Sequence, residues 1–259
     1  MTPPQTQSPR HSGVALITGG ARRIGVVLAR RLALAGYGVA IHCHASRAEA
    51  RALAAEIMAA GGRAAVCPAD LADVSALQGL CDSARDALGP VTLLVNNAAL
   101  FEPDTFQTLA AARYETQLAV NLRAPLFLSQ AFARALPEGM DGAIVNIIDQ
   151  RVWRLNPNNF SYTLSKAALW SATQTMAQAL APRIRVNAVG PGPSLANARD
   201  GAPGLAHEAR HVLLRREVPP DEIADAVLYL AAAKSVTGAM IAVDAGQHLS
   251  WRTRDVTGE

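Results

Sequence analysis

Val14-Ala15-Leu16-Ile17-Thr18-Gly19-Gly20-Ala21-Arg22-Arg23-Ile24-Gly25 is the stretch that decides the fold. Its four leading apolar residues predict a buried strand, the glycines predict a tight turn, and a helical pattern follows over residues 23–35. Glycines let backbone amides approach a pyrophosphate, and a helix N-terminus favours an anion. A glycine-rich turn can also be purely structural. Its place between the first strand and the first helix favours dinucleotide binding.

Apolar runs and helical patterns alternate along the rest of the chain. Short continuous apolar strands between helices predict an α/β fold: a single Rossmann-type, doubly wound parallel sheet of about seven strands, with helices on both faces. The expected strands are 14–17, 39–41, 64–67, 92–95, 143–148, 184–189 and 240–243. The expected helices after the first are 46–60, 74–88, 109–121, 125–136, 161–180 and 220–233, the second and third capped by Ser46 and Asp73.

The length of 259 residues fits one domain, which we expect to span residues 14–259. Residues 1–13 are polar and proline-rich, which predicts a disordered tail. Residues 194–218 are too long and irregular for a plain connection, which predicts a lid over the ligand.

Composition narrows the partners. The net charge is +3 and the basic residues form no run, so we expect no nucleic-acid-binding surface. The sequence has no window of 18 uninterrupted apolar residues, so we expect no membrane span. The three cysteines are an odd number and form no C-x-x-C pair, which indicates reduced thiols and a cytoplasmic protein.

A candidate proton-transfer site lies in the predicted helix 161–180. Tyr162 and Lys166 are four residues apart, so they share a helix face, and Asp149 stands thirteen residues before Tyr162. A cation at ~4 Å supplies the roughly 4 kcal/mol that lowers a phenol pKa by about three units, whereas an ionised Asp149 would raise it. The pair alone could equally be a solvated helix face. Special residues do, however, follow most of the strands, where ligands bind in such sheets: Gly19, His44, Asp70, Asn97, Asp149 and Gly192.

The end of the second strand indicates the cofactor. An NAD site usually has an acidic residue there, but residues 42–46 read His-Cys-His-Ala-Ser. This segment contains no carboxylate that would repel the 2′-phosphate of NADP(H). The phosphate could be bound by Arg22, Arg23, Ser46 and the two histidines, which favours NADP(H) as the cofactor. Alternatively, His42 and His44 are only residues at a strand end.

Together these pieces resemble the short-chain dehydrogenase/reductase family over about residues 14–249. The resemblance is carried by Thr18-Gly19 with Ile24-Gly25, Asn96-Asn97-Ala98, Asn121, the Tyr162/Lys166 pair and Pro191-Gly192. Three departures look like its pteridine reductase branch: Arg23 for a glycine, Asp149 for the usual serine, and Ala99-Leu100-Phe101 after Asn-Asn-Ala. That branch also shows His-x-His-x-Ser at positions 42, 44 and 46, although its common arginine is Ala45 here.

The resemblance implies an NADPH-dependent reductase of a dihydropterin- or dihydrofolate-type C=N bond, and a homotetramer. It implies a catalytic set of Asp149, Tyr162, Lys166 and Asn121, with Asn121 anchoring a water relay. Substrate would meet Arg23, Phe101, Asp149 and Tyr162. The cofactor would meet Gly19, Arg23, Ile24, Gly25, His42, His44, Ala45, Ser46, Asp70, Leu71, Asn97, Ala98, Ala99, Tyr162, Lys166, Pro191, Gly192 and Ser194. A general reductase of ketone, keto-acyl or sugar carbonyls and a non-catalytic NADP sensor are the alternatives.

Other patterns in the sequence are weaker indications of function. His207-Glu208-Ala209-Arg210-His211 matches the zinc-helix pattern H-E-x-x-H, but it lies in the lid without a further ligand, so we expect no metal. Trp153, Asn156, Asn158 and Asn159 either edge the substrate pocket or only shape a loop. Trp251 and Arg252 either reach a neighbouring subunit or belong to a frayed tail.

Overall fold

A computed structural model describes residues 13–196 and 200–251, so residues 1–12 of the predicted tail and Arg252 lie outside the described residues. Seven parallel strands form one sheet in the order β3-β2-β1-β4-β5-β6-β7, which confirms the doubly wound prediction. They are β1 Val14–Ile17, β2 Gly38–Cys43, β3 Arg63–Pro68, β4 Val91–Asn96, β5 Gly142–Ile147, β6 Ile184–Pro191 and β7 Met240–Val243. The order reverses between β1 and β4, where such sheets place their ligand crevice.

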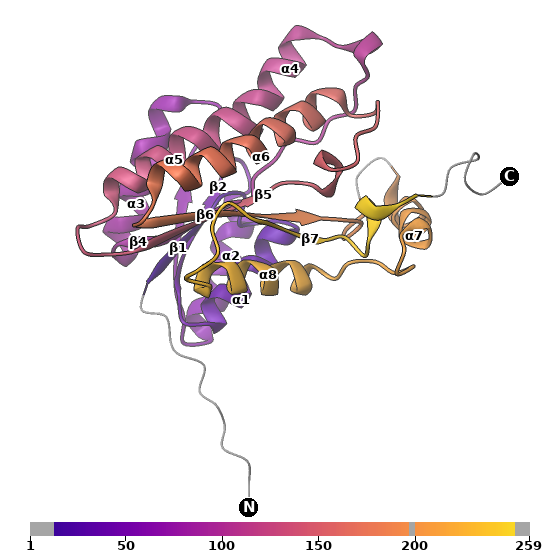
Figure 1. Ribbon diagram of the computed structural model, residues 1–259. Helices are drawn as coiled ribbons and strands as arrows, with labels where there is room; N and C mark the ends of the chain where they lie inside the picture. Colours follow the sequence, from indigo (N-terminus) through magenta and orange to yellow (C-terminus); the bar gives the residue numbers. More distant parts are fainter. Residues whose placement is uncertain (1–12, 197–199, 252–259) are drawn as a thin grey trace, which may run out of the picture.

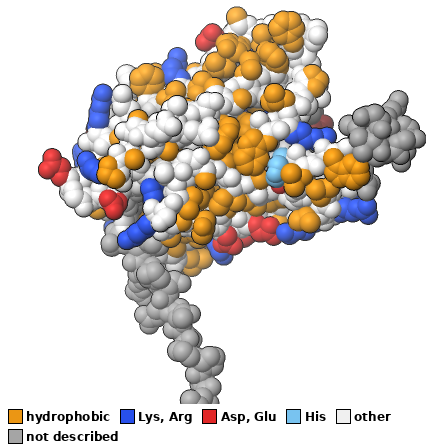
Figure 2. Space-filling view, viewed as in Figure 1, with side chains coloured by type: hydrophobic (Ala, Val, Ile, Leu, Met, Phe, Trp, Pro, Cys, Tyr) orange, Lys and Arg blue, Asp and Glu red, His pale blue; other side chains and the backbone are white. Residues whose placement is uncertain are grey.

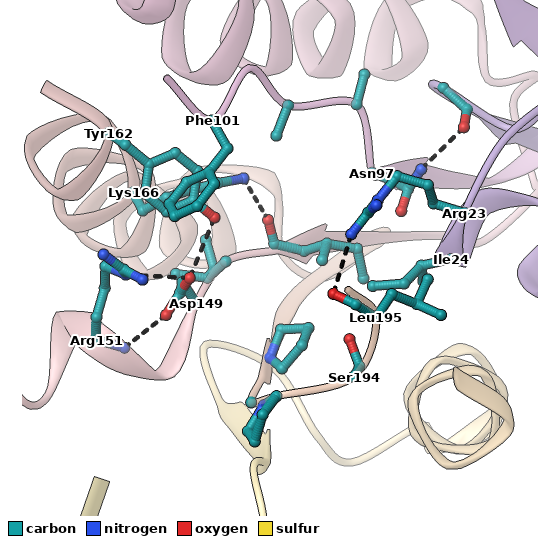
Figure 3. A pocket seen from close by; sticks show the side chains of 18 of the residues that line it. Arg23, Ile24, Asn97, Phe101, Asp149, Arg151, Tyr162, Lys166, Ser194 and Leu195 are labelled. Carbon is teal, nitrogen blue, oxygen red and sulfur yellow. Dashed lines mark hydrogen bonds and ion pairs between the residues drawn. The ribbon is translucent and has the colours of Figure 1, made fainter. Parts of the chain in front are cut away.

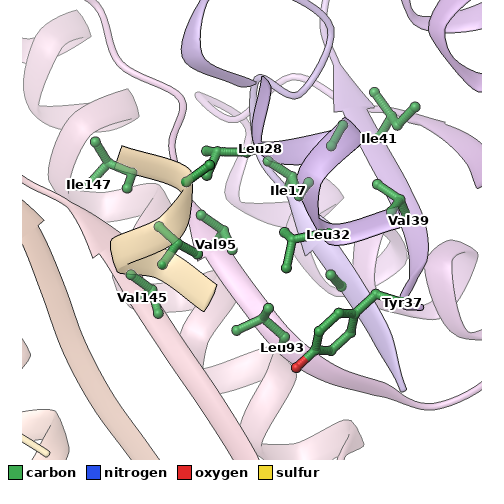
Figure 4. Close-up of a cluster of buried hydrophobic side chains, with 14 of the residues drawn as sticks. Ile17, Leu28, Leu32, Tyr37, Val39, Ile41, Leu93, Val95, Val145 and Ile147 are labelled. Carbon is green, nitrogen blue, oxygen red and sulfur yellow. The ribbon is translucent and has the colours of Figure 1, made fainter. Parts of the chain in front are cut away.

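Helices cover both faces of the sheet (Figure 1). One face carries α1 Ile24–Leu34, α2 Arg47–Ala59 and α8 Pro220–Ala232, and the other carries α3 Val74–Leu88, α4 Ala111–Leu118, α5 Ala124–Ala135 and α6 Phe160–Leu180. Alternate residues of β1 enter the two cores: Ile17 packs with Leu28 of α1 (Figure 4), while Leu16 packs on the opposite side. Because both faces are covered, the strands are mostly apolar, and the edge strand β3 is exposed only at its two ends, Arg63 and Pro68.

Helix ends follow local chemistry. Asp73 caps α3 as predicted, since its side chain accepts a hydrogen bond of 2.9 Å from the Ser75 amide. Ser46 occupies the cap position of α2, but its side chain makes no capping bond there.

The two helices predicted at 109–121 and 125–136 are one continuous helical run. A π-helical turn, Ala119–Arg123, joins α4 to α5, and it contains Asn121. Such turns insert one extra residue into a helix and often mark functional positions.

The predicted lid is more regular than expected. It contains helix α7, Gly201–His211, in which only Ala209 is buried. The sequence does not reveal this helix because its apolar stripe, Ala202, Leu205, Ala206 and Ala209, is mostly alanine and because Pro203 and Gly204 are poor helix formers. Within the part of the chain that the structure describes, no helix is long and apolar enough to cross a membrane.

Candidate active site

A cavity of about 420 Å³ opens past the carboxyl ends of β1, β4, β5 and β6 (Figure 3). It brings together most of the predicted site residues. Its lining is Gly19, Arg22, Arg23, Ile24, Asn97, Ala98, Ala99, Phe101, Ile147, Ile148, Asp149, Arg151, Tyr162, Lys166, Pro191, Gly192, Pro193, Ser194, Leu195, Leu205 and Glu208.

The glycine-rich turn is shaped by backbone conformation. Gly19 has φ 61°, which strains a residue with a Cβ, and a Cβ on Gly25 would lie 2.2 Å from the Gly19 carbonyl oxygen, so a side chain at Gly25 would displace the turn. Arg23 occupies the place of the usual glycine with φ 55°, a conformation that costs a non-glycine residue about 1–3 kcal/mol. The Asn97 side chain donates to the carbonyl oxygens of Thr18 at 2.9 Å and Gly19 at 3.2 Å, which fastens the turn to β4.

His42 supports this turn from beneath. Its Nδ1 accepts from the Gly19 amide at 3.0 Å, and its Nε2 donates to the Ala69 carbonyl at 3.1 Å. The side chain is buried, and desolvation lowers its pKa to about 4, so the ring is neutral at pH 7. Both ring nitrogens bond inside the protein, so His42 holds the glycine-rich turn, and its contact with the cofactor stays a prediction.

Tyr162, Asp149 and Lys166 meet at the inner end of the cavity. The Tyr162 hydroxyl donates to Asp149 Oδ2 at 3.2 Å, and Lys166 Nζ donates to the Ile147 carbonyl at 2.7 Å. Burial, and secondly Asp149, raise the pKa of Tyr162 well above 10. Burial lowers the pKa of Lys166 to about 8, although Asp149 opposes that shift. Burial and Asp149 outweigh the opposing charge of Arg151, so Tyr162 stays protonated at neutral pH.

Comparison with known proteins places the chain in a family. A protein-family profile described as "Enoyl-(Acyl carrier protein) reductase" matches residues 19–248. The chain belongs to the short-chain dehydrogenase/reductase family. FolM alternative dihydrofolate reductase 1 from Brucella suis, in complex with NADP, is 48% identical and has a TM-score of 0.91, covering 94% of this chain and 98% of that chain.

Two further relatives agree with this placement. The protein of the same name from Brucella canis, complexed with NADP, is 48% identical with a TM-score of 0.89, covering 95% of this chain and 98% of that chain. Pteridine reductase 1 of Leishmania tarentolae is 34% identical over 293 residues, covering 95% of this chain and 99% of the relative. The predicted resemblance to the pteridine reductase branch is confirmed.

In this short-chain dehydrogenase/reductase the loop after β4 is fastened at two points. The Asn121 side chain accepts from the Leu100 amide and donates to the Leu100 carbonyl, both at 2.8 Å. Asp104 is buried and accepts from the Ser161 amide at 3.1 Å and from the Ser161 hydroxyl, at the start of α6. Phe101 lies between these anchors, its ring 4.7 Å from that of Tyr162 and 43% of its surface exposed.

Arg151 is a site residue that the sequence interpretation missed. It follows Asp149 in the short 3₁₀ turn Gln150–Val152, and its Nε lies 3.2 Å from Asp149 Oδ2. Its amide donates to Asp149 Oδ1 at 2.9 Å, so one residue pairs with both carboxylate oxygens. An acid-x-arginine pair directly after a strand end was the only available signal.

Several predicted residues lie outside the cavity. His44 and Asp70 are exposed after β2 and β3, with Ala45 and Ser46 beside His44, while Gly25, Leu71 and Asn121 are buried behind the lining. Trp153 packs its ring edge against Trp170 and does not line the cavity, nor do Asn156, Asn158 and Asn159.

The H-E-x-x-H segment forms no metal site in the described part of the chain. His211 Nδ1 donates to the His207 carbonyl at 2.7 Å, as it would in a solvated helix turn. Over residues 13–196 and 200–251, no group of three His, Cys, Asp or Glu side chains is arranged to hold a metal ion. Glu208 instead lines the cavity.

Proposed function

We propose that this protein is an NADPH-dependent reductase that acts on the C=N bond of a dihydropterin- or dihydrofolate-type substrate. The observation that carries the proposal is a protonated Tyr162, hydrogen-bonded to Asp149, beside the partly uncovered ring of Phe101 in one cavity. The NADP-bound structures of the Brucella proteins and the similarity to a pteridine reductase support both the cofactor and the substrate class.

The turn between β1 and α1 fits a dinucleotide phosphate. No side chain caps the 11-residue helix α1, and the residues at its start, Arg22, Arg23 and Ile24, line the cavity. The positive end of a helix dipole favours an anion at such a place. Residues 42–46 contain no carboxylate, so nothing in that segment repels a 2′-phosphate near His44 and Ser46.

Side chains of the protein hold and deliver the proton. When bound, NADPH would supply the hydride that reduces the carbon of the C=N bond. Tyr162 would deliver its phenolic proton to the nitrogen, because its raised pKa keeps that proton in place until a basic acceptor arrives. Asp149 holds the hydroxyl in position, and its negative charge favours rapid reprotonation of the phenolate that remains.

Two other residues would bind the reactants. Lys166, fixed by the Ile147 carbonyl, would hold the nicotinamide ribose, and Phe101 would stack on one face of the flat substrate. Asn121 would anchor a water relay in addition to holding Leu100.

We also propose a single catalytic domain over residues 14–259 and a lid over residues 194–218. Arg23 supports the lid, since its guanidinium donates to the Leu195 carbonyl at 3.3 Å (Figure 3) and to the Ala196 carbonyl at 2.8 Å. We further propose a cytoplasmic homotetramer. Apolar side chains gather over the upper helices in Figure 2, and Phe127 of α5 and Leu164 of α6 are more than 40% exposed.

The test is NADPH oxidation with dihydromonapterin and dihydrobiopterin, alongside a panel of ketone, keto-acyl and sugar carbonyls. Tyr162→Phe should lose about 10²–10⁴-fold in kcat, and Asp149→Ala should also lose activity. Tyr229→Phe, at an exposed tyrosine of α8, is the matched control and should keep full activity. Unchanged pterin turnover in both site variants would overturn the assignment, and carbonyl turnover without pterin turnover would select the general reductase.

A further inference from the structure

The guanidinium of Arg151 lies beside the side chains of Asp149, Phe101 and Tyr162 (Figure 3). Its Nε is 3.2 Å from Asp149 Oδ2, and its Cζ lies 5.3 Å from the ring centroids of both Phe101 and Tyr162. The side chain is only 15% exposed. Its position is therefore set by the reacting end of the cavity and not by bulk water.

The Arg151 guanidinium does not use all of its hydrogen-bond donors. Its buried Nε is near enough to Asp149 for an ion pair but is not aligned for a hydrogen bond. The two terminal nitrogens donate to no residue in the described ranges, although a guanidinium carries five N–H donors. Only Nε is both buried and unbonded, whereas the two terminal nitrogens remain accessible to an acceptor in the cavity that Arg151 lines.

Arg23, the arginine that donates hydrogen bonds across the cavity, differs from Arg151 because its donors are already used. Both terminal nitrogens of Arg23 donate to carbonyl oxygens of residues 195 and 196, on the far side of the cavity. Arg23 is thus committed to the protein, whereas Arg151 keeps its donor edge for a ligand.

We propose that Arg151 is a specificity-determining residue that donates from its terminal nitrogens to the ring carbonyl oxygen of the flat substrate. The inference rests on the proposed pterin reductase function. Planar guanidinium donors fit an acceptor in the plane of a heteroaromatic ring, and a lysine ammonium does not reproduce this fork. The contact with Asp149 keeps the guanidinium beside Tyr162, so recognition of the ring oxygen would also orient the C=N bond toward the proton donor.

Steady-state kinetics of Arg151→Met and Arg151→Lys with dihydromonapterin test the inference. A charge-assisted hydrogen bond is worth about a 10- to 100-fold change in affinity, so KM should rise by that factor in Arg151→Met. Arg151→Lys, which keeps a positive charge near Asp149, should retain kcat within about fivefold while KM stays raised. Arg154→Met, at an exposed arginine of the same loop, is the control and should match the wild type.

A second measurement separates recognition from support of Asp149. Inhibition constants are compared for an oxidised 4-oxopterin and its 4-amino analogue, in which a donor replaces the ring oxygen. Arg151→Met should weaken the 4-oxo compound by about 10- to 100-fold and the 4-amino compound by less than about threefold. Equal weakening of both, or a loss in kcat with unchanged KM, would overturn the inference.

The two proposals fail in different ways. Wild-type protein that reduces no pterin would overturn the proposed function and this inference with it. Wild-type turnover of dihydromonapterin with an unchanged KM in Arg151→Met would overturn the role of Arg151 alone.

Discussion

Replacing Lys166 by methionine should separate the stability of this protein from its activity. Lys166 is 1% exposed, and its pKa is lowered from 10.5 to about 8 by burial, against the attraction of Asp149. Methionine keeps a similar length without the charge. The chain's other lysine, Lys234, is exposed after α8, so Lys234→Met is a matched control.

The magnitude follows from the pKa difference. Between pH 8 and pH 10.5 the unfolded chain binds more protons at this position than the folded chain, so folding stability rises with pH in that window. A difference of about 2.5 pKa units corresponds to about 3 kcal/mol, all of which opposes folding below pH 8. Loss of the hydrogen bond to the Ile147 carbonyl removes about 1–3 kcal/mol in the opposite direction. At pH 7 the cofactor-free variant should therefore be about as stable as the wild type.

Urea unfolding of the cofactor-free proteins at pH 7, 8, 9 and 10 measures the effect. The free energy of unfolding of the wild type should increase relative to Lys166→Met by about 2–3 kcal/mol between pH 7 and pH 10. The difference between the wild type and Lys234→Met should stay flat. NADPH-dependent turnover of Lys166→Met should fall by at least tenfold at every pH. A variant destabilised by several kcal/mol at pH 7, with no pH-dependent difference, would refute the reasoning.

Three further outcomes are expected. The pKa of His42 is lowered from 6.5 to about 4, so between these pH values the unfolded chain is protonated at this residue and the folded chain is not. The protein should therefore lose about 3 kcal/mol of stability as the pH falls from about 6.5 to 4. Acid unfolding of His42→Gln should lack this loss, and acid unfolding of His44→Gln, at an exposed histidine, should keep it. Arg23→Gly should raise the free energy of unfolding by about 1 kcal/mol by relieving φ 55°, yet raise the KM for NADPH because the bonds to residues 195 and 196 are lost. Asp104→Ala should cost about 1–2 kcal/mol in thermal unfolding and raise the KM for the pterin, because the loop that carries Phe101 loses its anchor to α6.

The sheet and part of the site are predictable because they depend on local patterns. Continuous apolar runs identify all seven strands, and the residues that follow those runs place Gly19, Asn97 and Asp149 at one edge of the sheet. Tyr162 and Lys166 need only the helical period. Each of these inferences uses spacing within one element or the rule that parallel strands end together.

The missed features depend on contacts between distant residues. Asp104 caps α6 through Ser161, 57 residues away, and no local signal predicts that pairing. Arg151 acquires its position only when its 3₁₀ turn folds back beside Phe101. His42 has a residue type common in phosphate sites, but its ring lies beneath the glycine-rich turn, where its nitrogens are already bonded.

The electrostatics of the site favour reduction over oxidation. Oxidation of an alcohol would need Tyr162 as a base, and its raised pKa disfavours deprotonation at pH 7. Reduction needs the same residue as an acid, and the proton is then already in place. Arg151 partly opposes the effect of Asp149, since its charge lowers the pKa of Tyr162. Burial raises the pKa of Tyr162 most, and Asp149 and Arg151 adjust it from opposite directions. Asp149→Ser would remove the contribution of Asp149 to the raised pKa of Tyr162 but leave the larger contribution of burial.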